Sequence, residues 1–180
     1  MKAGATPPAS RYPRVADGTL VPAHRMKWPS VSVLPAVPRG PNPMVQFDYG
    51  SKVAQGIIDK VPPQPKPRRY IVLVPAVDAD GNETGGVRLP EQAVPAQTST
   101  GWSLRSQAEG GQGELCYLDG QTIPFAPGKM VERYGDRQAY LAKVRESAQA
   151  LAKDGYVLEE DIDRIVARAD RNAKFENSAQ

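Results

Sequence analysis

Ser103 is the residue whose surroundings come closest to a nucleophile motif. The run from Gly101 to Arg105 begins as the G-x-S-x-G elbow does, in which glycines permit a strained turn from strand to helix. Its fifth position is Arg105 instead of glycine, and no helical pattern follows. A serine nucleophile also needs a base, and the only histidine, His24, lies in a proline-bounded stretch. The sequence therefore predicts no Ser–His catalytic pair.

Acidic residues gather in one short segment, Asp78-Ala79-Asp80-Gly81-Asn82-Glu83, which begins like a calcium-binding loop. Such a loop requires glycine at its sixth position and a bidentate glutamate at its twelfth, and these positions hold Glu83 and Leu89. A turn closed by hydrogen bonds to the Asp78 side chain is the better interpretation. The segment therefore predicts a turn and no metal site.

The remaining candidates for chemistry are isolated. Glu91 and Glu114 could act as an acid–base pair, although no spacing favours them over other carboxylates. Lys129 and Lys143 would need desolvation to act as bases, and both lie among charged residues. Cys116 is the single cysteine, and its apolar neighbours indicate a buried structural thiol. We assign no catalytic, cofactor-binding or metal-binding residue and expect no cofactor.

Composition limits the class of protein. The chain has 180 residues, a net charge of +3, 18 prolines and 16 glycines. A charge this small, without a dense basic patch, does not indicate a nucleic-acid partner. No apolar run is long enough to span a membrane, and the N-terminal residues lack the apolar core expected of a signal peptide. As it stands the chain is expected to be soluble and cytoplasmic, with its true compartment left open.

Prolines recur every few residues through 1–67, and they nearly exclude long helices there. We expect an extended arm that lies across another surface and is anchored by its aromatic residues. Residues 51–59 are the only early stretch with a helical face. The run Pro62-Pro63-Gln64-Pro65-Lys66-Pro67 predicts a polyproline II spacer.

Strand patterns occupy 68–128. The most apolar run, 70–74, leads through turn residues to a second run at 86–89. We predict antiparallel pairing of about 69–77 with 85–89. A second hairpin is predicted between 114–118 and 122–125, around Asp119-Gly120.

The segment 129–180 is typical of a helical hairpin. Apolar residues recur at helical spacing over 136–153 and again over 159–173, and Gly155 stands where a left-handed helix end is expected. The predicted fold class is therefore α+β, with a coil- and Pro-rich N-terminal arm, short antiparallel hairpins and a C-terminal αα-hairpin.

Several sequence blocks, in order over about 11–170, resemble one family. They include Y-P-R-V-A-D-G-T-L-V-P (12–22), L-V-P-A-V-D-A-D-G-N-E (73–83), G-V-R-L-P-E-Q-A-V-P (86–95), T-G-W-S-L-R (100–105) and E-R-Y-G-D-R-Q-A-Y (132–140). The chain resembles the C-terminal region of bacterial, esterase-like proteins with an alpha/beta-hydrolase domain. It would then be one incomplete domain made of the arm, the hairpin region and the αα-hairpin.

The resemblance implies that the nucleophile elbow and the catalytic histidine lie upstream of the matched region. The place of Ser103 is more usually asparagine in that family, and the connection between 126 and 132 is shortened here. Two functional classes stay open. The chain is either the tail of an acyl-ester hydrolase, a structural or pocket-covering part whose partner is the missing catalytic region, or a non-catalytic binding module. The binding module would use Trp28, Trp102 and the Pro-rich arm to contact another protein surface. The substrate and the oligomeric state are not specified by the sequence.

Overall fold

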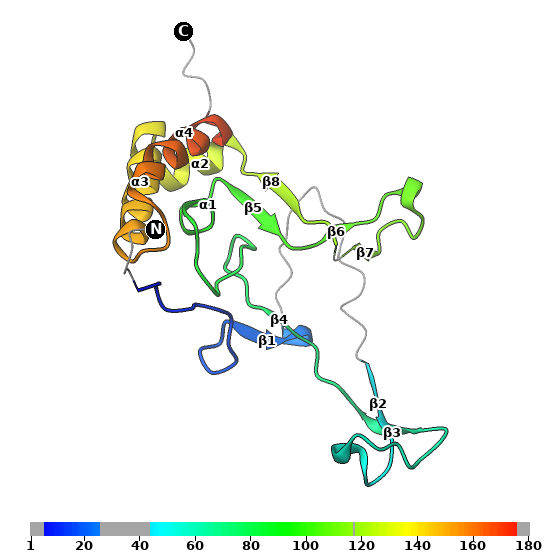
Figure 1. Ribbon diagram of the computed structural model, residues 1–180. Helices are drawn as coiled ribbons and strands as arrows, with labels where there is room; N and C mark the ends of the chain where they lie inside the picture. The colour runs from blue at the N-terminus through cyan, green and yellow to red at the C-terminus, as the bar shows by residue number, and fades with distance from the viewer. Residues whose placement is uncertain (1–5, 26–43, 117, 176–180) are drawn as a thin grey trace.

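A computed structural model describes residues 6–25, 44–116 and 118–175. Within these ranges the chain forms four two-stranded antiparallel sheets and a group of helices, in agreement with the α+β prediction. Figure 1 shows the helices packed together at one end of the molecule and the β2–β3 pair at the opposite end.

The strands, in chain order, are β1 (Leu20–Pro22), β2 (Val45–Asp48), β3 (Gln64–Arg69), β4 (Leu73–Pro75), β5 (Gln97–Thr100), β6 (Ser103–Leu104), β7 (Leu115–Cys116) and β8 (Gln121–Pro124). The pairs are β1 with β4, β2 with β3, β5 with β8, and β6 with β7. Short 3-10 turns, η1 (Ala23–Arg25), η2 (Val53–Gln55) and η3 (Gln107–Glu109), lie between them. The structure therefore has only one turn of 3-10 helix, η2, where a helix was possible at 51–59.

The predicted pairing of 69–77 with 85–89 is wrong. β4 pairs with β1, with Val74 opposite Val21, and only a single bridge joins Val77 to Glu83. Gly86 has φ +80°, which ends any strand there. The N-terminal arm also occupies this place, because a Cβ on Gly85 would come within 2.9 Å of Pro13.

The predicted polyproline spacer is also wrong, since 64–69 is strand β3. β3 pairs on one side only, with β2, and its other edge needs no backbone donor. Proline is tolerated in such an edge strand because its missing N–H faces away from the ladder. Pro65 and Pro67 are therefore compatible with the strand.

The second predicted hairpin is replaced by two longer-range pairings. β7 pairs with β6, and β8 pairs with β5, with Thr98 opposite Ile123. Phe125 N–H donates to the Ala96 carbonyl at 2.9 Å and extends the β5–β8 ladder towards the helices.

The helices are α1 (Pro90–Ala93), α2 (Pro127–Tyr134), α3 (Arg137–Lys153) and α4 (Ile162–Asn172), with the 3-10 turn η4 (Glu159–Asp161) before α4. The two predicted C-terminal helices are confirmed. Asp136 caps α3 by accepting a hydrogen bond from Ala139 N at 2.8 Å, and Gly155 has φ +82° just after α3 ends. α1 and α2 were not predicted, although each begins with proline at its first position.

One apolar core joins these helices to the end of the β5–β8 ladder. Its buried members are Ala96, Phe125, Met130, Tyr134, Tyr140, Val144, Ala169 and Ala173. The Tyr134 hydroxyl donates to the Pro95 carbonyl at 2.9 Å, and the Tyr134 and Tyr140 rings lie 5.1 Å apart. Burial raises the pKa of Tyr140 to about 12. The core therefore lies between α2, α3, α4 and the strands that precede them.

The first described part of the N-terminal arm, residues 6–25, contacts the helical region, but its aromatic residue is not the anchor. Tyr12 is exposed. Arg11 instead stacks 4.7 Å from the Tyr156 ring centre and pairs with Asp154 at 3.0 Å. The Tyr156 hydroxyl donates to the Ala9 carbonyl. Among the described residues, no helix is long and apolar enough to cross a membrane.

Candidate functional site

Ser103 and His24 lie on elements that share no sheet. Ser103 begins β6, directly opposite Cys116 of β7, and both residues are half-buried. His24 is exposed in η1, which follows β1. Figure 1 shows β6 and β1 as separate ribbons. The structure therefore does not bring the two residues together, and Cys116 is less buried than the sequence predicted.

The segment 78–83 is a turn closed by side-chain hydrogen bonds, as predicted. The Asp78 carboxylate accepts from the backbone N–H groups of Asp80 and Asn82, each at 3.0 Å. Its other oxygen pairs with Arg88 at 2.6 Å. Asp80 pairs with Lys129 at 2.8 Å and with Arg133. These carboxylates are thus neutralised by cations of the same chain.

Asp80 shows how this local network sets a pKa. Burial alone would raise the pKa of the Asp80 carboxyl, but hydrogen bonds from Lys129 and Arg133 outweigh burial and leave the pKa below its ordinary value. Lys129 also lies 3.8 Å from the centre of the Phe125 ring. Lys129 is therefore a structural cation that ties α2 to the 78–83 turn.

The other sequence candidates are dispersed. Glu91 lies in α1 and pairs with Arg168 of α4, whereas Glu114 lies beside β7, and its carbonyl accepts from Arg105 N–H at 2.9 Å. Lys143 lines a hollow of about 510 Å³ on α3. Trp102 is buried, and Trp28 lies outside the described residues. In the described ranges, no group of three or more His, Cys, Asp or Glu side chains could hold a metal ion.

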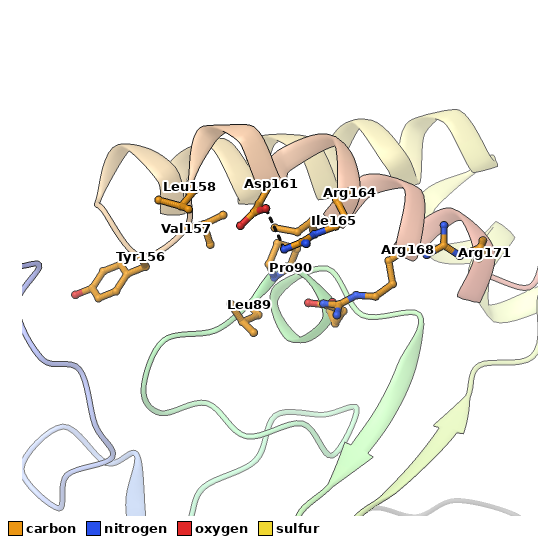
Figure 2. Close-up of a pocket in the computed structure, with 11 residues that line it drawn as sticks. Leu89, Pro90, Tyr156, Val157, Leu158, Asp161, Arg164, Ile165, Arg168 and Arg171 are labelled. Carbon is orange, nitrogen blue, oxygen red and sulfur yellow. Dashed lines mark hydrogen bonds and ion pairs between the residues drawn. The ribbon is translucent and has the colours of Figure 1, made fainter. Parts of the chain in front are cut away.

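A groove between α1 and α4 is lined by more charged side chains than the hollow beside Lys143 (Figure 2). Its volume is about 460 Å³. Apolar residues from the start of α1, the loop before η4 and α4 line it: Leu89, Pro90, Val157, Leu158 and Ile165. Tyr156, on which Arg11 stacks, lies at one end. The groove is thus assembled from segments that are distant in sequence.

Three arginines of α4 line the groove, Arg164, Arg168 and Arg171. Their spacing of four and three residues places them on one face of the helix. Arg164 pairs with Asp161 at 2.9 Å, and Arg168 pairs with Glu91 of α1. Figure 2 shows Arg164 turned towards Asp161 and Arg168 extended towards the first turn of α1. The sequence signal for these arginines is their spacing, which places them on one charged face of the predicted helix, beside the apolar face of 159–173.

Comparison with known proteins identifies the family. Residues 2–167 match the model of the alpha/beta hydrolase domain family. Neither a comparison with curated proteins nor one with solved structures gave a match. The match covers most of the chain and agrees with the resemblance of its sequence blocks. The chain therefore belongs to the alpha/beta hydrolase domain family.

Proposed function

We propose that this chain is a non-catalytic portion of an esterase-like alpha/beta-hydrolase protein, corresponding to its C-terminal region. In this role it packs against the region that carries the nucleophile and the base, and it covers or shapes the pocket there. Membership of the family supports the hydrolase assignment. The observation that carries the proposal is the set of exposed apolar residues in residues 44–73.

Residues 44–73, which we call the β2–β3 lobe, contain no buried residue. Their exposed large apolar side chains are Met44, Phe47, Tyr49, Val53, Ile57, Ile58, Val61, Tyr70, Ile71 and Leu73. Val61 is 81% exposed and Ile71 is 67% exposed. A lone two-stranded ribbon is at best marginally stable in water, so such a lobe gains most of its stability from a surface that covers it.

Charge indicates the kind of surface. The lobe carries five basic residues, Lys52, Lys60, Lys66, Arg68 and Arg69, against two acidic ones, Asp48 and Asp59. Lys60 and Asp48 pair with each other at 2.5 Å. A partner surface that is apolar at its centre and acidic at its rim would complement the lobe. We infer that the catalytic region presents this surface.

The non-catalytic part of the proposal rests on Ser103 and His24. Acyl transfer by serine needs an imidazole or an equivalent base within hydrogen-bond reach. Ser103 lies in the β6–β7 ribbon opposite Cys116. The imidazole of His24 belongs to η1, and no hydrogen bond joins it to Ser103 among the described residues. In alpha/beta hydrolases the nucleophile stands on a turn from strand to helix, whereas β6 leads into the 3-10 turn η3.

The segments 1–67, 68–128 and 129–180 are proposed to be parts of one incomplete domain. Ala96 and Phe125 share a core with the helices, which favours a single unit for the second and third segments. The alternative, a free-standing binding module, would use Trp28, Trp102 and the Pro-rich arm as contact residues. Burial of Trp102 within the chain removes that residue from any contact surface.

Hydrolysis of p-nitrophenyl acetate and butyrate tests the proposal, with wild type measured beside Ser103→Ala and His24→Ala. We expect equal, near-background rates for all three proteins. Turnover above background that both variants abolish would show a Ser–His mechanism and overturn the proposal.

A second test addresses the partner. A reading frame immediately upstream that encodes a G-x-S-x-G stretch would supply the catalytic region, and its product should co-purify with this chain. Replacing Val61 and Ile71 of the lobe with serine should weaken that association at least tenfold. The Leu118→Ser variant is the control, because Leu118 is even more exposed than Val61 and Ile71 but lies outside the lobe. An affinity for the upstream product that is unchanged in the lobe variants would contradict the proposed packing.

A further inference from the structure

The arginine-lined groove between α1 and α4 has a surplus of positive charge. Arg164, Arg168 and Arg171 contribute three positive charges, and Asp161 and Glu91 contribute two negative ones. Each acid is already paired with one arginine. Arg171 makes no ion pair with any residue that the structure describes. The groove therefore has one cation that an external anion can neutralise.

The groove also has an apolar wall that the described chain leaves open. Leu89 is 43% exposed and Leu158 is 59% exposed, one from each side of the groove. Ile165 and Val157 continue this wall between them. A volume of about 460 Å³ lies within the range of small-molecule sites, roughly 300–1,000 Å³. Such a wall favours a ligand with an apolar body.

We propose that this groove binds a monoanionic carboxylate with an apolar body, such as a medium-chain aliphatic acid. The planar guanidinium fork matches the two oxygens of a carboxylate. One carboxylate neutralises the single net positive charge of the groove, whereas a phosphate dianion would leave the groove with a net negative charge. In this arrangement Arg171 receives the carboxylate, and the apolar chain of the ligand lies along Ile165 and Leu89. The inference is independent of the proposed function, because the groove lies within the chain itself.

Calorimetric titration of the full chain with octanoate at low ionic strength tests the proposal. Octanoate should bind, while acetate, which lacks the body, and octan-1-ol, which lacks the charge, should each bind at least tenfold more weakly. Arg171→Gln should weaken octanoate binding roughly tenfold, as expected for the loss of a charge-assisted hydrogen bond. Arg105→Gln is the matched control, because Arg105 is exposed in a distant loop and should bind octanoate as wild type does.

A variant that strengthens binding separates recognition from damage to the fold. Glu91→Gln removes the acid that pairs with Arg168 and leaves a second cation available. It should tighten octanoate binding several-fold, on the order of the worth of one partly exposed ion pair. Leu89→Ser should weaken octanoate binding and leave acetate binding unchanged.

Three results would overturn the proposal. They are equal affinities for octanoate and octan-1-ol, displacement of octanoate by an equal concentration of inorganic phosphate, and unchanged affinity in both Arg171→Gln and Glu91→Gln. The first would show an apolar site without charge recognition. The second would show a general anion site, and the third would place binding elsewhere on the chain.

Discussion

Replacing Asn82 with alanine is expected to lower the free energy of unfolding by about 2–6 kcal/mol. The Asn82 side chain is fully buried beside β5. Its amide donates to the Gln97 carbonyl at 3.1 Å, and its carbonyl oxygen accepts from Ser99 N–H at 2.8 Å. Ala96 bonds to Phe125 of the β8 segment, so the alternation of an antiparallel ladder turns the backbone groups of Gln97 and Ser99 away from β8. Asn82 therefore takes the place of a neighbouring strand on the free edge of β5.

The magnitude follows from what the substitution leaves behind. Each unsatisfied buried backbone group costs roughly 1–3 kcal/mol, and the alanine variant leaves one donor and one acceptor. For a chain of this size the loss corresponds to a fall in melting temperature of roughly 4–24 °C. Denaturant unfolding followed by circular dichroism at 222 nm measures the free energy, provided that the transition is two-state.

The control is Asn172→Ala, because Asn172 is exposed at the end of α4 and should change stability by less than about 0.5 kcal/mol. A loss below about 1 kcal/mol in Asn82→Ala would refute the reasoning. It would mean that water reaches the edge of β5 and satisfies both backbone groups.

Three further predictions concern stability and exposed surface. The pKa of Asp80 is lowered in the folded state, so its stabilising contribution is present above its ordinary pKa of 3.8 and is lost as pH falls through the lower folded value. The unfolding free energies of wild type and Asp80→Asn should therefore differ most near pH 7 and converge in acid, and a gap that is constant with pH would contradict this. Gly155→Ala, at φ +82° where a Cβ would make only an ordinary van der Waals contact with Pro8 at 3.7 Å, should cost about 1 kcal/mol. Gly120→Ala should cost more in the same denaturant assay, because its Cβ would come within 2.5 Å of the Thr100 carbonyl oxygen. The β2–β3 lobe should bind a hydrophobic dye strongly, and a cooperative melt without dye binding would count against its exposure.

The sequence predicted the helices that have a complete local signal. α3 and α4 each carry an apolar stripe, and the Asp136 cap and Gly155 mark the two ends of α3. α1 and α2 were not predicted because proline within a run usually indicates the end of a helix. Pro90 and Pro127 stand at first helical positions, where proline lacks no needed donor and its φ suits the helix.

Strand pairing was harder to predict because each run was matched with the nearest run along the chain. The strands instead pair over long separations, as β1 does with β4 and β5 with β8. Turn chemistry at 78–83 was predicted correctly, yet the turn does not join two long strands. Its Asp78 side chain closes the turn on itself, and Asn82 reaches β5. A local turn signal thus specifies the turn and leaves the partners of the flanking segments unspecified.

The candidate site shows the same division. The sequence could establish that no histidine lies near Ser103 in the chain; in the structure Ser103 belongs to the β6–β7 sheet and His24 to η1, the turn after β1. The groove between α1 and α4 could not be predicted, because the contact between Glu91 and Arg168 joins residues 77 positions apart. Only the arginine spacing on α4 was available in the sequence.

The run Tyr70–Val74 is more exposed than its residue types would indicate. Its apolar, β-branched composition is typical of a strand with a covered face, yet Tyr70 is 57% exposed and only the end of the run, in β4, is paired. An apolar, β-branched run gains little from a two-stranded ribbon in water, and it gains roughly 25 cal/mol for each Å² of apolar surface that another layer covers. The pattern of this run is that of a strand with a layer over it, and the described chain supplies none. The disagreement between pattern and exposure thus coincides with the lobe to which we assign the contact with the catalytic region.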